Sequence, residues 1–271
     1  MNPTVKQALK RFYPPKVRHL KRRLEVRYLG KGEPELGLLP ALLDRDRIAI
    51  DVGANIGDYL DVLARHARRV LAFEPHPLCF RHLQRVEPRR CQLFNLALSD
   101  RPGMAELRVP VEDAEISALA TIEAGNPSLP TTCGRVVTYP VRTERLDDVS
   151  VCHLAPGEGV GFIKIDVEGH ELAVLEGGAA TIAAHRPLVM VETEYRHGAP
   201  VERIFSFFRE RAYLARALVN GRLVEIDPPS LARLQDESKL VGEDNDRRES
   251  SYINNVLFFP EEQTALAARH G

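Results

Sequence analysis

The residues of this chain that are best suited to chemistry are acids and glycines placed at the ends of apolar runs. Asp51 ends the run 47–50, and the turn after it carries Gly53 and Gly57 before a helical pattern begins near Tyr59. A strand that ends in an acid, turns on glycines and enters a helix is typical of nucleotide-binding turns. Glycine also permits close approach between the backbone and a ligand. This turn therefore predicts a site for a nucleotide-like cofactor.

A second acid, Glu74, ends the next apolar run, 70–73. An acid about 20 residues after the glycine turn is placed to accept hydrogen bonds from ribose hydroxyls. Asn55 stands where the second glycine of the dinucleotide fingerprint would fall, and the Asp51 carboxylate would repel a pyrophosphate. S-adenosylmethionine has no phosphate and carries two cationic groups. The pattern favours this cofactor over NAD.

A second group of polar residues follows the apolar run 160–165, which carries Lys164 in its interior. Asp166, Glu168 and His170 come after this run, and ligands of open α/β sheets bind at the carboxyl ends of the strands. We therefore expect these side chains to face the same crevice as the glycine turn. A buried lysine needs a partner of opposite charge, so Lys164 should pair with a neighbouring acid.

Four of these side chains are candidates for a general base: Asp166, Glu168, His170 and Glu192, which ends the following apolar run. Carboxylates and imidazoles are the groups that most often remove protons in enzymes. Glu168 could instead favour the dipole of the next helix. Asp166, His170 and Glu192 would also suit Mg²⁺ or Mn²⁺, but nothing in their spacing fixes a geometry. A divalent metal is therefore possible but not expected.

Strand-like and helix-like runs alternate from residue 47 onward, which predicts a mostly parallel sheet covered by helices. The predicted strands are 47–51, 70–74, 91–97, 160–166 and 187–192, and the predicted helices are 58–66, 77–86, 170–184 and 199–211. Two late runs, 212–226 and 251–260, have no helix between them, and Asn220-Gly221 reads as a tight turn inside the first. We expect the last strand to run antiparallel at the sheet edge.

The chain divides into a basic N-terminal extension, 1–40, and one domain, 41–265, with an inserted segment at about 100–158. The lysine- and arginine-rich start of the extension is either a solvated arm or a contact for an anionic lipid surface or glycan. Within the insertion, the turn-rich residues 124–132 are either a substrate lid or a surface loop. The charged residues 242–251 indicate a further loop.

Composition limits the class of protein. The chain has 271 residues, 44% of them hydrophobic, which is enough for one full core. A formal net charge of −1 argues against a nucleic-acid partner. The four cysteines show no C-x-x-C spacing, and no apolar signal core is apparent, so we expect a cytoplasmic location, possibly peripheral at a membrane.

Several motifs together resemble the FkbM family of S-adenosylmethionine-dependent methyltransferases, over about residues 45–260. They are DVGANIGDY (51–59), FEP (73–75), NLALSD (95–100) followed by Gly103, RLDDV (145–149), IKIDVEGHE (163–171), Gly177-Gly178-Ala179, Arg186-Pro187 with Glu192, and NVLFFP (255–260). They occur in the family order, and IKIDVEGHE after FEP is the most specific of them. The first forty residues lie outside the resemblance.

The resemblance implies a class I methyltransferase fold, which is Rossmann-like and doubly wound, with seven strands of which the last is antiparallel. It also implies methyl transfer to a hydroxyl, usually on a sugar or a polyketide-type metabolite. In this chain the implied cofactor-binding residues are Asp51, Gly53, Ala54, Asn55, Gly57, Tyr59, Glu74, Ala97 and Asp166. Of these, Glu74 would hold the ribose, Ala97 would line the adenine and Asp166 would lie beside the sulfonium.

Two other functions stay open at this point. An NAD-dependent sugar oxidoreductase would share the sheet and the glycine turn, but Asn55 and Asp51 disfavour it. A non-catalytic cofactor-binding partner in a biosynthetic complex would also share them, although it has no need for acids clustered at the strand ends.

Overall fold

The structure of the protein is a computed structural model that describes residues 33–86, 90–111, 120–123, 125–127, 135–235 and 252–263. The basic residues 1–27, most of the predicted lid at 124–132 and the charged residues 242–251 lie outside these ranges. Within them, no helix is both long enough and apolar enough to cross a membrane.

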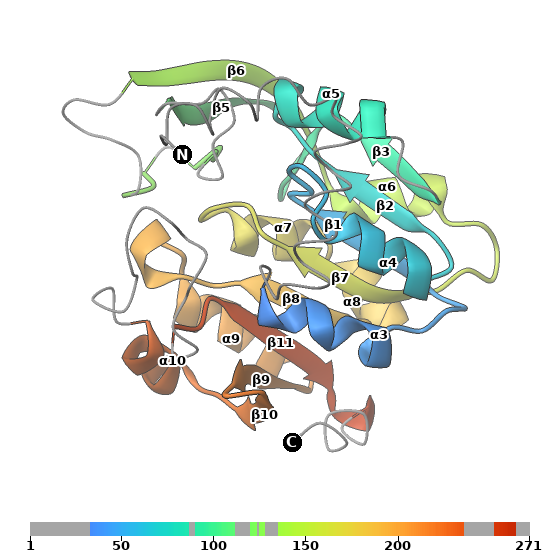
Figure 1. The fold of residues 1–271 in the computed structure, drawn as a ribbon, viewed down its shortest axis with the longest axis vertical. Coiled ribbons are helices and arrows are strands. Elements are labelled where there is room, and N and C mark those ends of the chain that lie inside the picture. Colours follow the sequence, from blue (N-terminus) through green and yellow to red (C-terminus); the bar gives the residue numbers. More distant parts are fainter. Residues whose placement is uncertain are drawn as a thin grey trace, which may run out of the picture.

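The main sheet has eight strands in the order β10-β9-β11-β8-β7-β1-β2-β3 (Figure 1). Their bounds are β1 Ile48–Val52, β2 Val70–Phe73, β3 Cys91–Phe94, β7 Val160–Ile165, β8 Leu188–Glu192, β9 Tyr213–Val219, β10 Arg222–Glu225 and β11 Asn255–Pro260. The order reverses between β1 and β7, which pair in parallel with Asp51 opposite Lys164. The predicted α/β fold with a mostly parallel sheet is confirmed.

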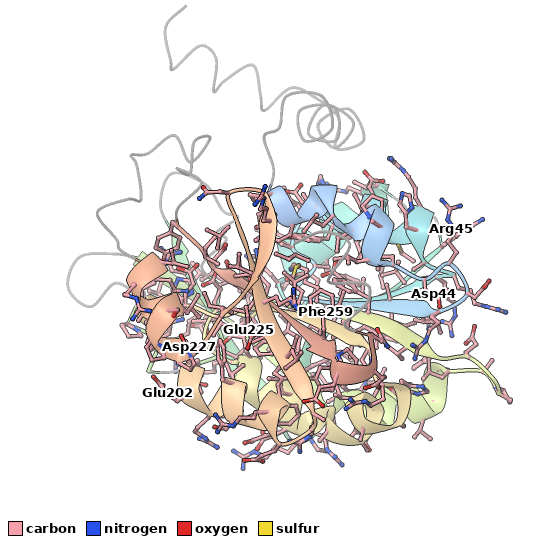
Figure 2. All side chains as sticks on the ribbon, turned by 90° about the horizontal axis from the view of Figure 1, so that it is seen from below. Asp44, Arg45, Glu202, Glu225, Asp227 and Phe259 are labelled. Carbon is pink, nitrogen blue, oxygen red and sulfur yellow. The ribbon has the colours of Figure 1, made fainter. Side chains whose placement is uncertain are left out.

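The last strand is antiparallel, as predicted, but its predicted place at the sheet edge is wrong. β11 pairs with β8 on one side and β9 on the other. All six of its residues are buried, including Phe259, whereas Glu225 of β10 is exposed (Figure 2). The β9–β10 hairpin turns at Asn220 and Gly221, both with positive φ, as expected for a tight turn. This hairpin supplies an eighth strand at the edge, which is largely exposed, so the fully buried last strand lies inside the sheet.

Helices cover both faces of the main sheet because its strands are apolar on both faces. Ile50 of β1 packs with α6 (Leu146–His153), α7 (Glu171–Gly177), α8 (Ala179–His185) and α9 (Val201–Arg209). Ala49, on the opposite face, packs with α3 (Leu39–Leu42), α4 (Leu60–His66) and α5 (Pro77–Val86). The other helices within the described residues are η1 (Pro34–Gly37), η2 (Tyr195–His197), α10 (Pro228–Leu234) and η4 (Glu261–Gln263).

The described end of the predicted N-terminal extension is packed against the domain. Leu36 of η1 and Leu39 of α3 are buried in the same cluster as α4. The predicted boundary at residue 40 therefore falls inside a packed segment.

The predicted insertion contains a small separate sheet, seen at the top of Figure 1. Its strands are β4 (Ala97–Leu98), β5 (Gly103–Val111) and β6 (Arg135–Glu144), in the order β4-β6-β5. β5 and β6 are antiparallel and pair along nine residues, from Gly103 opposite Thr143 to Val111 opposite Arg135. Thr121, between them in the chain, forms an isolated bridge with Arg108 of β5. The insertion is thus a folded layer beside the carboxyl end of the main sheet.

The helix predicted over 170–184 is two helices, α7 and α8, which meet at Gly178. The end of α7 makes a close approach at Gly177, where an added Cβ would lie 2.0 Å from the carbonyl oxygen of Ser99. No side chain fits between these two backbones. The Gly177-Gly178 pair therefore lets the end of α7 pack directly on the segment after β4.

This close approach makes a prediction about stability. Gly177→Ala should lower the free energy of unfolding by about 1–3 kcal/mol, because the methyl group forces two backbones apart. Urea unfolding of the full chain measures the change. Gly37→Ala is the matched control, since an added Cβ at Gly37 meets no atom within 4 Å. Equal stability of the two variants would contradict the packing described for α7.

Candidate active site

A cavity of about 490 Å³ lies at the carboxyl ends of β1, β2, β7 and β8. Its polar lining includes Glu74, Lys164, Asp166, Glu168, His170 and Glu192. Its apolar lining includes Leu96, Ala97 and Leu98 from the segment before and within β4, together with Leu107, Ala120 and Ile122 from the insertion. Acidic residues from distant parts of the chain thus meet around one cavity, as their positions after the strands predict.

The glycine turn after β1 lines the cavity with Gly53, Ala54, Asn55 and Tyr59, whereas Gly57 lies behind this surface. The N–H groups of Gly53 and Ala54 both donate to the carbonyl of Phe73, each at 3.0 Å. Gly53 has a φ of 79°, and a Cβ there would lie 1.8 Å from the carbonyl oxygen of Asp166. Glycine is therefore required at this position by the contact with the backbone after β7.

Asp51 lies behind the cavity wall, where it is fully buried beside Lys164. The Lys164 Nζ is 3.7 Å from Asp51 Oδ1 and 3.0 Å from Asp166 Oδ2. The expectation that Lys164 pairs with an acid is confirmed. Burial raises the pKa of Asp51 to about 6 although the lysine opposes the shift. Burial disfavours the ammonium, but Asp166 and Asp51 outweigh it and raise the pKa of Lys164.

Glu74 is held at the opposite wall by two backbone groups. Its carboxylate accepts hydrogen bonds from the N–H of Asn55 at 2.6 Å and from the N–H of His76 at 2.7 Å. Burial nevertheless raises the pKa of Glu74 to about 7. The carboxylate is therefore fixed in position, with its remaining lone pairs available to hydroxyl groups inside the cavity.

Three of the predicted catalytic residues converge: Asp166, Glu168 and Glu192 each have a carboxylate oxygen within 4.8 Å of the others. Burial and the neighbouring Asp166 charge raise the pKa of Glu192 well above its usual value. Burial also acts on Asp166, but Lys164 and hydrogen bonds from Glu192 and Lys164 outweigh it and lower its pKa. The two carboxyl groups therefore differ in proton affinity, because Lys164 favours the charged form of Asp166 while burial and Asp166 disfavour that of Glu192.

Glu168 has an unusual backbone conformation, with a φ of 56°. Its Oε2 lies 2.7 Å from the Nδ1 of His197, a residue that is 3% exposed. Burial raises the pKa of Glu168, while the contact with His197 opposes that shift. Burial disfavours the charged imidazole of His197, but Glu168 and Glu194 outweigh it and raise its pKa.

His170 lines the cavity, but both of its ring nitrogens contact other side chains. Nδ1 lies 3.0 Å from Glu123 Oε2, and Nε2 lies 2.9 Å from Ser99 Oγ. The sequence offered Asp166, His170 and Glu192 as possible metal ligands. The structure instead clusters Asp166, Glu168 and Glu192, without His170.

The sequence reasoning missed several polar residues at this site. Glu33 lines the cavity and accepts hydrogen bonds from the Tyr59 hydroxyl at 2.5 Å and from Asn255 Nδ2 at 2.8 Å. Arg196 also lines the cavity, and His197 contacts Glu168 from outside it. The run Glu194–His197, which follows soon after β8, could have indicated that Arg196 and His197 lie near the site. Nothing in the sequence around Glu33 distinguishes it from the extension.

Comparison with known proteins identifies the family. The family model described as "Methyltransferase FkbM domain" matches residues 51–215, which is more than half of the chain. The curated "Methyltransferase sdnD" of Sordaria araneosa is 30% identical over 162 residues. That match covers 51% of this chain and 62% of the relative, so the chain spans less than two thirds of the relative's length.

Solved structures give weaker likenesses. A methyltransferase FkbM from Methylobacillus flagellatus KT has 17% identity and a TM-score of 0.48, with coverage of 93% of this chain and 57% of the other. A putative methyltransferase from Streptococcus mutans, solved in complex with SAH, has 9% identity and a TM-score of 0.40, with coverage of 84% and 97%. Through the family model, the protein belongs to the FkbM methyltransferase family, whose methyl donor is S-adenosylmethionine, the cofactor that its sequence predicts.

Proposed function

We propose that this protein is an O-methyltransferase that acts on a hydroxyl of a sugar or a related small metabolite, with Glu168 as its general base. The observation that carries the proposal is the group of three carboxylates, Asp166, Glu168 and Glu192, at the cavity wall. An alcohol must lose its proton as it is methylated, so a basic side chain beside it accelerates the reaction. A neutral amine needs no such group before it attacks.

The cavity suits S-adenosylmethionine, which supplies an electrophilic methyl group when bound. Glu74 has the orientation to accept hydrogen bonds from ribose hydroxyls, and Ala97 with Leu96 and Leu98 offers an apolar surface to a purine ring. The turn 53–55 would hold the methionine part. Asp166 would lie near the sulfonium, where a carboxylate is electrostatically favourable.

The choice of Glu168 among the candidate bases follows from the proton affinities of the cluster. Asp166 pairs with Lys164 and is a weak base because its pKa is lowered. Burial and the neighbouring Asp166 charge raise the pKa of Glu192 most strongly of the three, which makes it the least readily ionised of them. Glu168 combines a raised pKa with an imidazole whose Nδ1 lies 2.7 Å from its carboxylate, which suits a group that takes up and releases a proton. The ring nitrogens of His170 are both engaged, which favours a positioning role for that residue.

The acceptor follows from the charge of the cavity. Carboxylates dominate its polar lining, and Lys164 is already paired with Asp166 of this lining and with Asp51 behind it. Hydroxyl groups donate hydrogen bonds to carboxylates, whereas an anionic group beside them would be repelled. A neutral polyhydroxyl acceptor fits this lining best.

The assignment of Glu74 makes a prediction about cofactor binding. Glu74→Ala should weaken the binding of S-adenosylhomocysteine at least tenfold, because charge-assisted hydrogen bonds contribute about 1.5–3 kcal/mol each. Calorimetry on the full chain measures the affinity. In the wild type the affinity should rise as pH increases through about 7, since the Glu74 carboxylate becomes a full acceptor only when deprotonated. Glu74→Gln should lose this pH dependence, and an unchanged affinity in Glu74→Ala would exclude the ribose contact.

The assignment of Glu168 makes a prediction about turnover. Glu168→Gln should lower kcat by about 10²–10⁴-fold, the usual contribution of a general base, while S-adenosylhomocysteine still binds. The assay is transfer of a radiolabelled methyl group from S-adenosylmethionine to a panel of neutral sugars and polyketide-type alcohols. Glu176→Gln is the matched control, because Glu176 is exposed on α7.

Other outcomes of this assay have definite meanings. If Glu168→Gln keeps near-normal turnover and one of Asp166→Asn, Glu192→Gln or His170→Asn loses turnover, the residue changed in that inactive variant is the general base. Failure of the wild type to label any hydroxyl compound, with cofactor binding intact, would favour a non-catalytic cofactor-binding partner.

A further inference from the structure

The backbone of Glu168 is in a conformation that its own sequence does not favour. A left-handed φ in a residue with a side chain costs about 1–2 kcal/mol, and such a residue keeps this conformation only where its surroundings impose it. Gly169 follows with a φ of 99°, so two successive residues take positive φ values between the end of β7 and the start of α7. The direction of the Glu168 side chain depends on this turn.

Two buried side chains of the insertion hold the turn. The carbonyl of Glu168 accepts a hydrogen bond from Thr121 Oγ1 at 2.7 Å and another from Asn126 Nδ2 at 2.6 Å. Thr121 is 1% exposed and Asn126 is 5% exposed, so water does not compete for either bond. No other carbonyl in the described part of the chain receives two such bonds from buried side chains of the insertion.

These donors are themselves anchored in the insertion. The backbone N–H and carbonyl of Thr121 pair with the carbonyl and N–H of Arg108 in β5, at 3.0 and 2.8 Å. The segment is also packed closely against the loops beneath it. A Cβ at Gly169 would lie 2.8 Å from the carbonyl oxygen of His197, and one at Gly198 would lie 3.1 Å from the ring of Pro127.

We infer that Thr121 and Asn126 are positioning residues, which hold the Glu168 backbone so that its carboxylate stays beside Asp166 and Glu192. The described residues 120–123 and 125–127 would then connect the small sheet of the insertion to the acids at the cavity. Loss of the two hydrogen bonds frees the turn to relax to a negative φ, and the carboxylate leaves the cluster and its contact with His197. This inference rests on the proposed function for the role of Glu168, but its structural part does not require turnover.

His197 provides a reporter of where the Glu168 carboxylate lies. Burial and the charge of Arg196 lower the pKa of its imidazole. The carboxylates of Glu168 and Glu194 raise that pKa. Only the Glu168 contact depends on the turn after β7. Movement of that carboxylate should therefore lower the pKa of His197, while its other neighbours stay in place.

The experiment compares Thr121→Val, Asn126→Ala and their combination with the wild type, by NMR titration of the histidine rings in the full chain. A His197→Gln sample assigns the reporter signal, and Glu168→Gln gives the result expected when the carboxylate charge is lost. We expect the pKa of His197 to fall toward that of Glu168→Gln in the combined variant. Thr121→Ser, which keeps the hydroxyl, should restore the wild-type titration. Thr138→Val, the same change on the exposed side of β6, is the control.

In the methyl-transfer assay, Thr121→Val should lower kcat about 10–100-fold with little change in S-adenosylhomocysteine affinity, as expected for a displaced catalytic group. A wild-type titration of His197 in the combined variant would overturn the inference, whether or not turnover is detected. If the combined variant does not fold, the single isosteric change Thr121→Val decides the question. A normal His197 titration and unchanged kcat in that variant would equally overturn it. Absence of methyl transfer by the wild type would count against the proposed function and leave the titration result standing.

Discussion

The site depends on one buried cation. Lys164 lies in the middle of the main sheet, 3% exposed, opposite Asp51 across the β1–β7 pair. A buried ammonium without a partner would cost several kcal/mol, so its place in the sheet requires the two carboxylates beside it. The ring of Tyr59 adds a cation–π contact, with Nζ 4.9 Å from its centroid. The lysine thereby allows Asp166 to remain charged at the cavity wall although Glu168 and Glu192 lie so near.

Around this cation, the proton affinities of the acids differ although their chemistry is the same. Burial acts on both acids, but Lys164 lowers the pKa of Asp166, whereas the Asp166 charge adds to burial and raises the pKa of Glu192. Glu168 lies between these extremes because an imidazole, rather than an ammonium, stands beside it. Neighbours of different charge thus give three equivalent groups different roles.

Much of this arrangement could be predicted from the sequence, because local patterns determine it. The apolar runs predicted the strands β1, β2, β7 and β8. The acids that follow them lie at one cavity because parallel strands end at the same side of a sheet. The contribution of Glu33, Thr121, Asn126 and His197 could not be predicted, because these residues reach the site only through tertiary contacts. The same is true of the close approach of Gly177 to the carbonyl of Ser99, which is distant in the sequence.

The position of β11 has a consequence for the order in which the chain assembles. β8 and β9 run parallel to each other and are separated by a gap that only β11 fills. During synthesis, more than thirty residues follow β9 before β11 leaves the ribosome, and until then two strand edges in the middle of the sheet have no partner. Unpaired edges invite pairing with other chains. The sheet is therefore complete only when one short, fully buried strand inserts between β8 and β9.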